Sequence, residues 1–92
     1  MLYKQKQQFL CRQHRFLEET GRLSYSLTED TLPDGVSYYS ITIDCDGNAL
    51  LDHKTVRNFT TDKQEALRIF WQLCRGTVTP YGLLEVLPEL LP

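Results

Sequence analysis

Four side chains with amide or carboxylate oxygens follow one another between residues 44 and 52 and could coordinate a calcium ion. They take the first, third, fifth and ninth places of the register in which calcium-binding loops arrange their ligands. These residues are Asp44, Asp46, Asn48 and Asp52. The sixth place lacks the glycine of such loops, and the twelfth is Thr55 instead of a bidentate glutamate. We therefore expect no calcium site, because a tight hairpin turn at residues 46–48 explains the same residues.

The cysteines and histidines do not form a recognisable metal or catalytic arrangement. Cys11 and His14 have the spacing of half a zinc site, but a structural zinc site needs four ligands and no second pair exists. Nothing selects His53, Cys45 or Cys74 for a cysteine–histidine catalytic pair. Motifs of phosphate-binding loops, dinucleotide-binding folds, zinc peptidases and α/β-hydrolases are absent. The sequence therefore predicts no catalytic residue, no metal, no cofactor and no enzymatic activity.

The size and composition are those of one ordinary globular domain spanning residues 1–92. A chain of 92 residues with 41% hydrophobic residues can bury a core without disulfides or a metal. No apolar run approaches the length of a membrane span, and the N-terminus lacks the apolar segment of a signal peptide. An odd number of cysteines without an export signal indicates reduced thiols, so we expect a cytoplasmic protein.

Charge is distributed unevenly along the chain. Residues 23–53 contain no lysine or arginine but six acidic residues. They are Glu29, Asp30, Asp34, Asp44, Asp46 and Asp52. One interpretation is that they lie in solvated turns, and the other is that they form an acidic edge that meets a basic partner. The net charge of −2 disfavours direct nucleic-acid binding. The one feature that favours such binding is a small basic and aromatic patch that could form from Arg12, Arg15, Phe16, Arg22 and Tyr25.

The C-terminal third predicts two helices, over residues 61–75 and 80–87. Thr61 and Gln64 form a capping box at the start of the first helix, and Gly76 is placed for the left-handed position after its end. Thr79 and Pro80 are typical of the start of the second helix.

The second helix has two possible C-terminal structures, an end or a kink. Pro88 cannot donate a main-chain hydrogen bond, so the helix should end or kink near Leu87. Leu90 and Leu91 follow. They pack either on the chain's own core or on a partner.

The N-terminal segment supports two interpretations. Apolar residues at seven-residue spacings predict an amphipathic helix, favoured for residues 3–10. The competing interpretation begins a strand near Cys11 and turns at residues 19–21 into a strand over residues 22–28. Periodicity does not decide between them for residues 11–18.

Residues 11–57 predict mainly β-structure. The clearest strand is 36–45, in which Tyr39, Ile41, Ile43 and Cys45 point to one face. It follows a loop over residues 28–35, and a weaker strand comes next at about 49–57. The predicted fold is a small antiparallel β-meander of three or four strands followed by two C-terminal helices packed on one face, an α+β domain.

Four segments resemble a family of short proteins of unknown function from Firmicutes, chiefly Clostridia. They are G-R-L-S-Y-S-L, Y-Y-S-I-T-I, V-R-N-F-T-T-D and R-G-T-V-T-P-Y-G-L-L-E-V-L. The family ends in a V-(S/T)-P-x-x-L segment, which residues 78–83 match, whereas Pro88 departs from its acidic end. The resemblance covers roughly residues 11–91. It favours a strand for residues 11–18 and implies no known activity, cofactor or catalytic residue. Such short proteins often lie on mobile elements.

By elimination, the sequence predicts a small non-enzymatic module that binds another protein. Its candidate contact residues are Glu29, Asp30, Asp34, Tyr38, Asp44, Asp46, Asp52, Leu90 and Leu91. The alternative is an inhibitor encoded by a phage or mobile element, similar to an anti-CRISPR, that blocks a nucleic-acid-acting enzyme through an acidic surface. The identity of the partner and a homo-oligomeric state both stay open.

Overall fold

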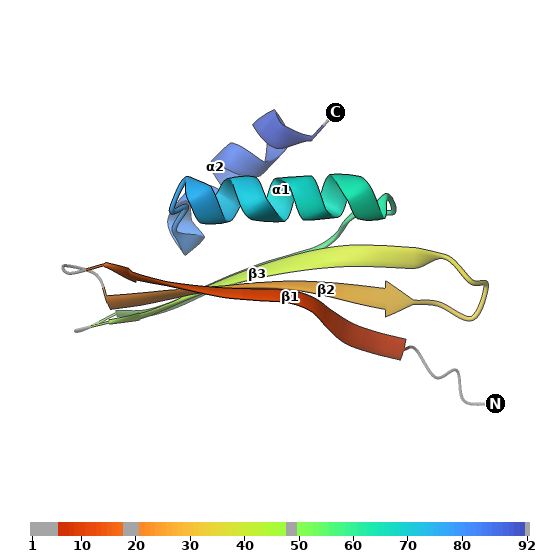
Figure 1. Cartoon of the computed structure of the whole chain (residues 1–92), viewed down its shortest axis with the longest axis horizontal. Helices are drawn as coiled ribbons and strands as arrows, with labels where there is room; N and C mark the ends of the chain where they lie inside the picture. Colours follow the sequence, from red (N-terminus) through yellow and green to blue (C-terminus); the bar gives the residue numbers. More distant parts are fainter. Residues whose placement is uncertain (1–5, 18–20, 48–49, 92) are drawn as a thin grey trace.

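A four-stranded antiparallel sheet carries both helices on one of its faces (Figure 1). The computed structural model describes residues 6–17, 21–47 and 50–91, and side chains within 7–16, 21–46 and 53–91. The elements are β1 Lys6–Leu17, β2 Gly21–Thr31, β3 Ser37–Gly47, β4 Leu50–Thr60, α1 Lys63–Arg75 and α2 Pro80–Leu90. The strands lie in the order β1-β2-β3-β4. This confirms the predicted α+β fold of a meander followed by two helices.

The first strand is longer than either N-terminal interpretation. β1 begins at Lys6 and pairs with β2 along its whole length, so the helix favoured for residues 3–10 is wrong for residues 6–10. β2 likewise runs on to Thr31, and the connection to β3 shortens to residues 32–36. The predicted turns at 19–21 and 46–48 fall in part outside the described residues.

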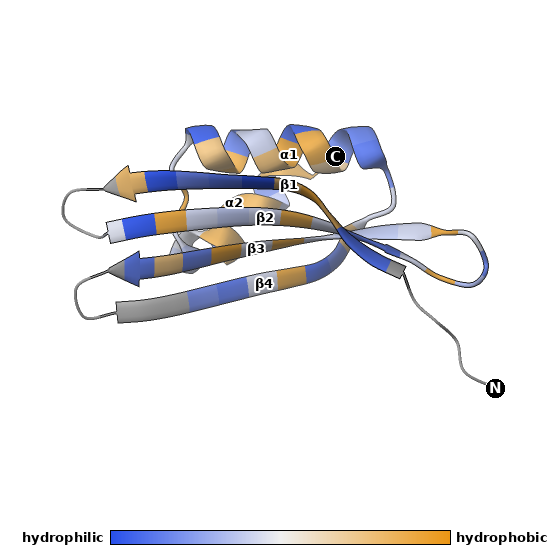
Figure 2. Ribbon diagram, turned by 60° about the horizontal axis from the view of Figure 1, so that its bottom comes forward, coloured by the Kyte–Doolittle hydropathy of each residue, from blue (hydrophilic) through white to orange (hydrophobic). Residues whose placement is uncertain are grey.

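The core lies between the sheet and the helices. Alternate side chains of β2 and β3 point toward the helices because successive residues of a strand face opposite sides. The buried apolar residues are Leu23, Tyr25, Leu27, Tyr39, Ile41, Ile43, Ala66, Ile69, Phe70, Leu73, Cys74, Leu83 and Leu87. Orange, apolar segments accordingly occur in α1 and alternate with polar segments along the strands (Figure 2).

Two irregularities change which side chains face the helices. An extra residue, Leu10, lies between Phe9, opposite Thr28, and Cys11, opposite Leu27. Phe9 therefore points away from the helices, whereas Leu10 and Cys11 pack against the core.

The other irregularity lies in β4, where the register shifts between Val56 and Thr60. Asn58 there adopts a left-handed φ of 54°. Its main-chain N–H donates to the Ser40 hydroxyl at 3.0 Å. That bond satisfies a donor that the interrupted ladder leaves without a strand partner.

The caps of α1 differ by one residue from the sequence prediction. Asp62, not Thr61, is the N-cap, and its carboxylate accepts from the N–H groups of Gln64 and Glu65. At the other end Gly76 has a helical φ of −78°, so its predicted left-handed conformation is wrong. Thr77 takes the positive φ instead, at 52°. Asp and Thr are both good N-caps, so their adjacency left the first residue ambiguous.

Helix α2 begins as predicted but ends later. The hydroxyl of Thr79 accepts from the N–H of Gly82, and Pro80 is the first helical residue. The helix continues through Pro88 to Leu90, so the predicted end near Leu87 is wrong. Pro88 is exposed, while Leu87 is buried and Leu90 packs against the core. Burial on both sides of the proline offsets the hydrogen bond that it lacks. No helix among the described residues is long and apolar enough to cross a membrane.

The N-cap assignment gives a direct stability prediction. We expect Asp62→Ala to lower the free energy of unfolding by about 1 kcal/mol, because two main-chain donors lose their acceptor. Thr61→Ala is the matched control and should change it by less than about 0.5 kcal/mol, since Thr61 is exposed. Urea unfolding followed by circular dichroism measures both. A larger loss for Thr61→Ala would return the cap to the residue that the sequence predicted.

Candidate functional site

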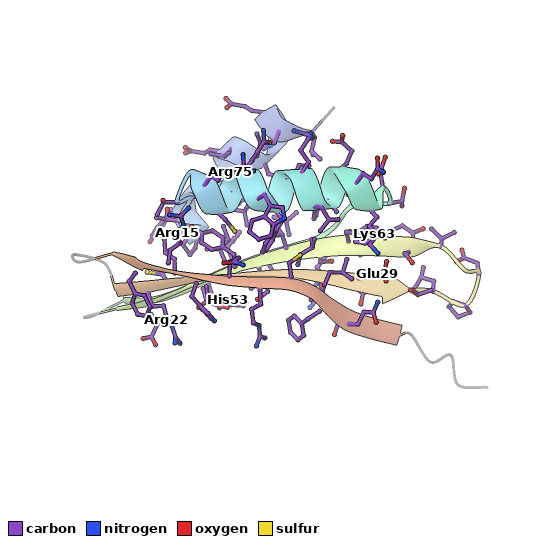
Figure 3. The ribbon with its side chains drawn as sticks, in the orientation of Figure 1. Arg15, Arg22, Glu29, His53, Lys63 and Arg75 are labelled. Atoms are coloured by element: carbon purple, nitrogen blue, oxygen red, sulfur yellow. The ribbon has the colours of Figure 1, made fainter. Side chains whose placement is uncertain are left out.

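No element of the described chain covers the face of the sheet opposite the helices (Figure 1). We call it the open face. Its side chains alternate with those of the core, so the same strands build both. Figure 3 shows Arg22 and His53 projecting to this side, and Arg15 to the helix side. Described side chains that line its two hollows are Gln7, Phe9, Arg12, His14, Arg22, Ser24, Ser26, Thr28, Asp30, Ser40, Thr42, Asp44, Asp46, His53, Thr55 and Arg57.

Two phenylalanines of β1 belong to the open face and remain exposed. Phe9 is 61% and Phe16 81% exposed. Phe16 lies opposite Arg22 in the register, and the bulge at Leu10 turns Phe9 to the same side. The guanidinium carbon of Arg12 lies 4.3 Å from the centre of the Phe9 ring, a cation–π contact. Exposed aromatic side chains supported by arginine are typical of protein contact surfaces.

Hydroxyl groups form the floor of the open face. The Thr28 hydroxyl contacts the Ser40 carbonyl oxygen at 3.4 Å, and the hydroxyls of Thr42 and Thr55 are 2.9 Å apart. The two adjoining hollows above this floor have volumes of ≈ 330 and ≈ 400 Å³. Both are shallow depressions of an exposed sheet. They suit a surface that accepts a partner's side chains.

One row of polar groups on this face resembles a catalytic triad in its connectivity. His53 Nδ1 lies 2.5 Å from a carboxylate oxygen of Asp44, and its Nε2 lies 3.3 Å from the Thr55 hydroxyl. The side chains of His53 and Asp44 are 65% and 46% exposed. Water therefore screens the pair, and the Thr55 hydroxyl already bonds to Thr42. The arrangement orders this part of the open face and gives little activation of a nucleophile.

Asp30 differs from the other described polar groups of this face, because it has a buried side-chain oxygen without a hydrogen-bond partner. It is only 7% exposed, although it lines the smaller hollow. In the described part of the chain its Oδ1 atom has no hydrogen-bond partner. Buried carboxylate oxygens are nearly always partnered in folded proteins. Asp30 is therefore the described side chain of the open face that would gain most from a hydrogen-bond donor supplied by another molecule.

The acidic residues of the middle third do not all lie on one surface. Glu29 lies on the helix side, where it accepts from the Tyr39 hydroxyl at 2.6 Å. Asp34 accepts from the N–H of Val36 within the β2–β3 turn. Asp44 pairs with His53, and Asp46 lies 4.0 Å from Arg22. The Asp52 side chain is outside the described residues, as is its Asn48 neighbour in the calcium register.

The three other predicted contact residues also lie in different parts of the structure. Tyr38 is half-buried, and its place opposite Asp30 puts it on the open-face side of β3. Leu90 and Leu91 are partly buried against the core at the end of α2. The C-terminal leucines therefore pack on the chain's own core, which was one of the two interpretations left open by the sequence.

The cysteines serve packing. Cys11 faces the helices and His14 the open face, because an odd separation along a strand places side chains on opposite sides. Burial raises the pKa of the Cys74 thiol to about 11 and also raises that of Cys11, so both resist forming the reactive thiolate. The described residues contain no group of three or more potential metal ligands.

Phe9 was not identified as a surface residue from the sequence, and Phe16 was grouped there with residues that lie on the other side of the sheet. The proposed basic and aromatic patch is split, because Tyr25 is in the core and Arg15 projects to the helix side (Figure 3). Phe16, Arg12 and Arg22 remain on the open face. A signal for Phe9 existed in its seven-residue spacing to Phe16, but this spacing also suits a helix.

Comparison with known proteins adds a family but no activity. The model of a family of unknown function, DUF6514, matches residues 7–92, and the chain belongs to that family. No curated protein and no solved structure gives a significant match.

Proposed function

We propose that this member of a family of unknown function is a non-enzymatic module that binds another protein through the open face of its sheet. The observation that carries the proposal is the pair of exposed phenylalanines, Phe9 and Phe16, on a face that no element of the described chain covers. Each exposes an apolar ring to water, and covering such rings is a main source of binding free energy at protein interfaces.

The charges of the open face favour a protein over a nucleic acid. Among its described side chains three arginines stand beside three aspartates: Arg12, Arg22, Arg57, Asp30, Asp44 and Asp46. Surfaces that bind phosphate backbones carry an excess of lysine and arginine. A balanced surface with aromatic side chains is better suited to the mixed chemistry of a protein.

The inhibitor hypothesis remains the second candidate. An anti-CRISPR-like protein of a phage or mobile element in Firmicutes would act in the cytoplasm and use an acidic surface. Its support is the acid-rich stretch of residues 23–53. The ion pair of Asp46 with Arg22 weakens that support, because it neutralises part of the field. Binding that is lost at high salt would favour the inhibitor, whereas salt-resistant binding would favour the contact through the phenylalanines.

Site-directed photo-crosslinking tests the proposed surface. One variant carries p-benzoylphenylalanine in place of Phe16, and a matched variant carries it in place of Tyr81, which is 83% exposed on α2. Both are irradiated in lysate of the native host and the adducts are identified by mass spectrometry. We expect position 16 to give an adduct with one protein, and position 81 not to.

A second substitution makes the test specific. Adding Phe9→Ser to the position-16 variant should reduce the adduct at least tenfold, because an exposed aromatic contact of the same surface is lost. No adduct from position 16, or equal adducts from both positions, would refute the open face as the binding surface. An adduct consisting only of two copies of the chain would replace the proposal by a homo-oligomer.

A further inference from the structure

The hollow around Asp30 contains a buried carboxyl oxygen that no described group satisfies. Asp30 lies in β2 between Gln7 of β1 and Tyr38 of β3. Asp30 is 7% exposed, and its Oδ1 atom accepts no hydrogen bond from the described residues. No ion pair joins it to a cation among the residues with described side chains. A carboxylate in such a place loses hydration without gaining a partner.

The nearby arginines of the same hollow do not relieve Asp30. Arg12 lies over the ring of Phe9 at 4.3 Å, and Arg57 lines the hollow without an ion pair to Asp30. The surrounding groups are hydroxyls, among them Thr28 and Ser40. Hydroxyl and carboxylate oxygens can accept several N–H donors at once. The hollow therefore offers acceptors around Asp30, and none of the described donors that line it bonds to the Asp30 Oδ1 atom.

We infer that the protein partner inserts an arginine side chain into this hollow and that its guanidinium pairs with the Asp30 carboxylate. The inference rests on the proposed function. The hollow of ≈ 330 Å³ is at the lower end of the range of about 300–1,000 Å³ for ligand pockets, as fits one long side chain.

A guanidinium matches the hollow better than an ammonium. It has five donors in a planar fork that matches a carboxylate with two bonds, and it is less strongly hydrated than an ammonium. The remaining donors face the hydroxyl of Thr28, which lines the same hollow two residues from Asp30 along β2. The exposed Phe9 ring at the rim adds a surface that already holds one guanidinium.

The probe for the first test is capped arginine, N-acetyl-arginine amide, titrated into the ¹⁵N-labelled chain. We expect saturable shifts of the amide signals of residues 28–31 and 38–40. Capped citrulline, which has nearly the same shape without the charge, should give none. Asp30→Asn should weaken the binding of capped arginine at least about tenfold, because a charge-assisted pair is lost. Asp46→Asn is the charge-matched control and should keep the wild-type shifts, since Asp46 lies outside this hollow.

A second measurement separates binding from a structural role. The urea midpoint of Asp30→Asn should equal or exceed that of the wild type, because the substitution removes a buried charge without a partner. A lower midpoint would show that Asp30 stabilises the fold and would overturn the inference. Equal shifts with citrulline, or unchanged arginine binding by Asp30→Asn, would also overturn it. If any of these results overturns the arginine inference but position 16 still crosslinks to a partner, the proposed function is not refuted.

Discussion

Phe70→Ala should lower the free energy of unfolding by about 3–5 kcal/mol, the largest loss that we expect from one side chain. Phe70 is fully buried in the middle of α1. Its ring meets that of Trp71 edge to face, with centroids 5.2 Å apart and planes at 83°. Removing the ring loses its transfer free energy and leaves a cavity between α1 and the sheet. The loss is a large share of the ~5–15 kcal/mol that stabilises a typical domain.

Phe16→Ala is the matched control for this substitution. It removes the same atoms from a side chain that is 81% exposed. We expect a change below about 0.5 kcal/mol, because little apolar contact is lost. Urea unfolding at pH 7 measures both variants, and the midpoint of Phe70→Ala should fall by about 3 M or more at a slope near 1 kcal/mol per molar. Equal losses would mean that Phe16 is covered in solution, as in a homo-oligomer.

The core could be predicted from the sequence because its signal is local. In β3 the apolar side chains of Tyr39, Ile41 and Ile43 alternate with polar ones, and the structure buries all three. The start of α2 was equally readable, because Thr79 and Pro80 act through bonds to their own turn. In these two elements the local pattern of residue types determines which side chains are buried and where the helix begins, so the sequence prediction and the structure agree.

The candidate site was harder to predict because it depends on register. Phe9 and Cys11 face opposite sides of the sheet because of the bulge at Leu10. The residue types around Leu10 do not indicate a bulge, so this change of side could not be predicted. Asp44 meets His53 across two strands, a contact set by the pairing of β3 with β4. The acidic run is continuous in the sequence, but a strand sends Glu29 and Asp30 to opposite faces. Charge runs therefore overstate the charge of any one surface.

Alkaline pH should destabilise the chain through Tyr25, which is fully buried below the α1–α2 connection. Its hydroxyl donates to the carbonyl oxygen of Val78 at 2.8 Å. Burial raises the pKa of Tyr25 to about 12, above the ordinary value of 10.0. Below pH 10 the hydroxyl is neutral in both states and its contribution is complete. Above pH 10 the unfolded chain releases this proton first, so the free energy of unfolding falls by about 1.4 kcal/mol per pH unit until pH 12.

Other buried groups act in the same direction. Burial raises the pKa of Cys74 from 9.0 to about 11. Burial, followed by the hydrogen bond to Glu29, raises that of Tyr39 to about 12. Each group keeps its proton longer in the folded state, so each loses its contribution as pH rises. Alkaline unfolding should therefore spread over about pH 9–12, and a substitution is needed to isolate the part due to Tyr25.

Tyr25→Phe isolates the contribution of Tyr25 to alkaline unfolding, because it removes both the hydrogen bond to Val78 and the ionisable hydroxyl, which have opposite effects on stability at high pH. At pH 7 the variant should be less stable by about 1–2 kcal/mol, because the Val78 carbonyl loses its donor. Between pH 10 and 12 it should lose less stability than the wild type, so the two curves of unfolding free energy against pH should cross near pH 11. Tyr81→Phe, at a position 83% exposed, is the control and should stay within about 0.5 kcal/mol of the wild type at pH 7. Parallel curves for Tyr25→Phe and the wild type would show that the Tyr25 hydroxyl ionises alike in both states, and the hydrogen bond to Val78 would then not hold its proton.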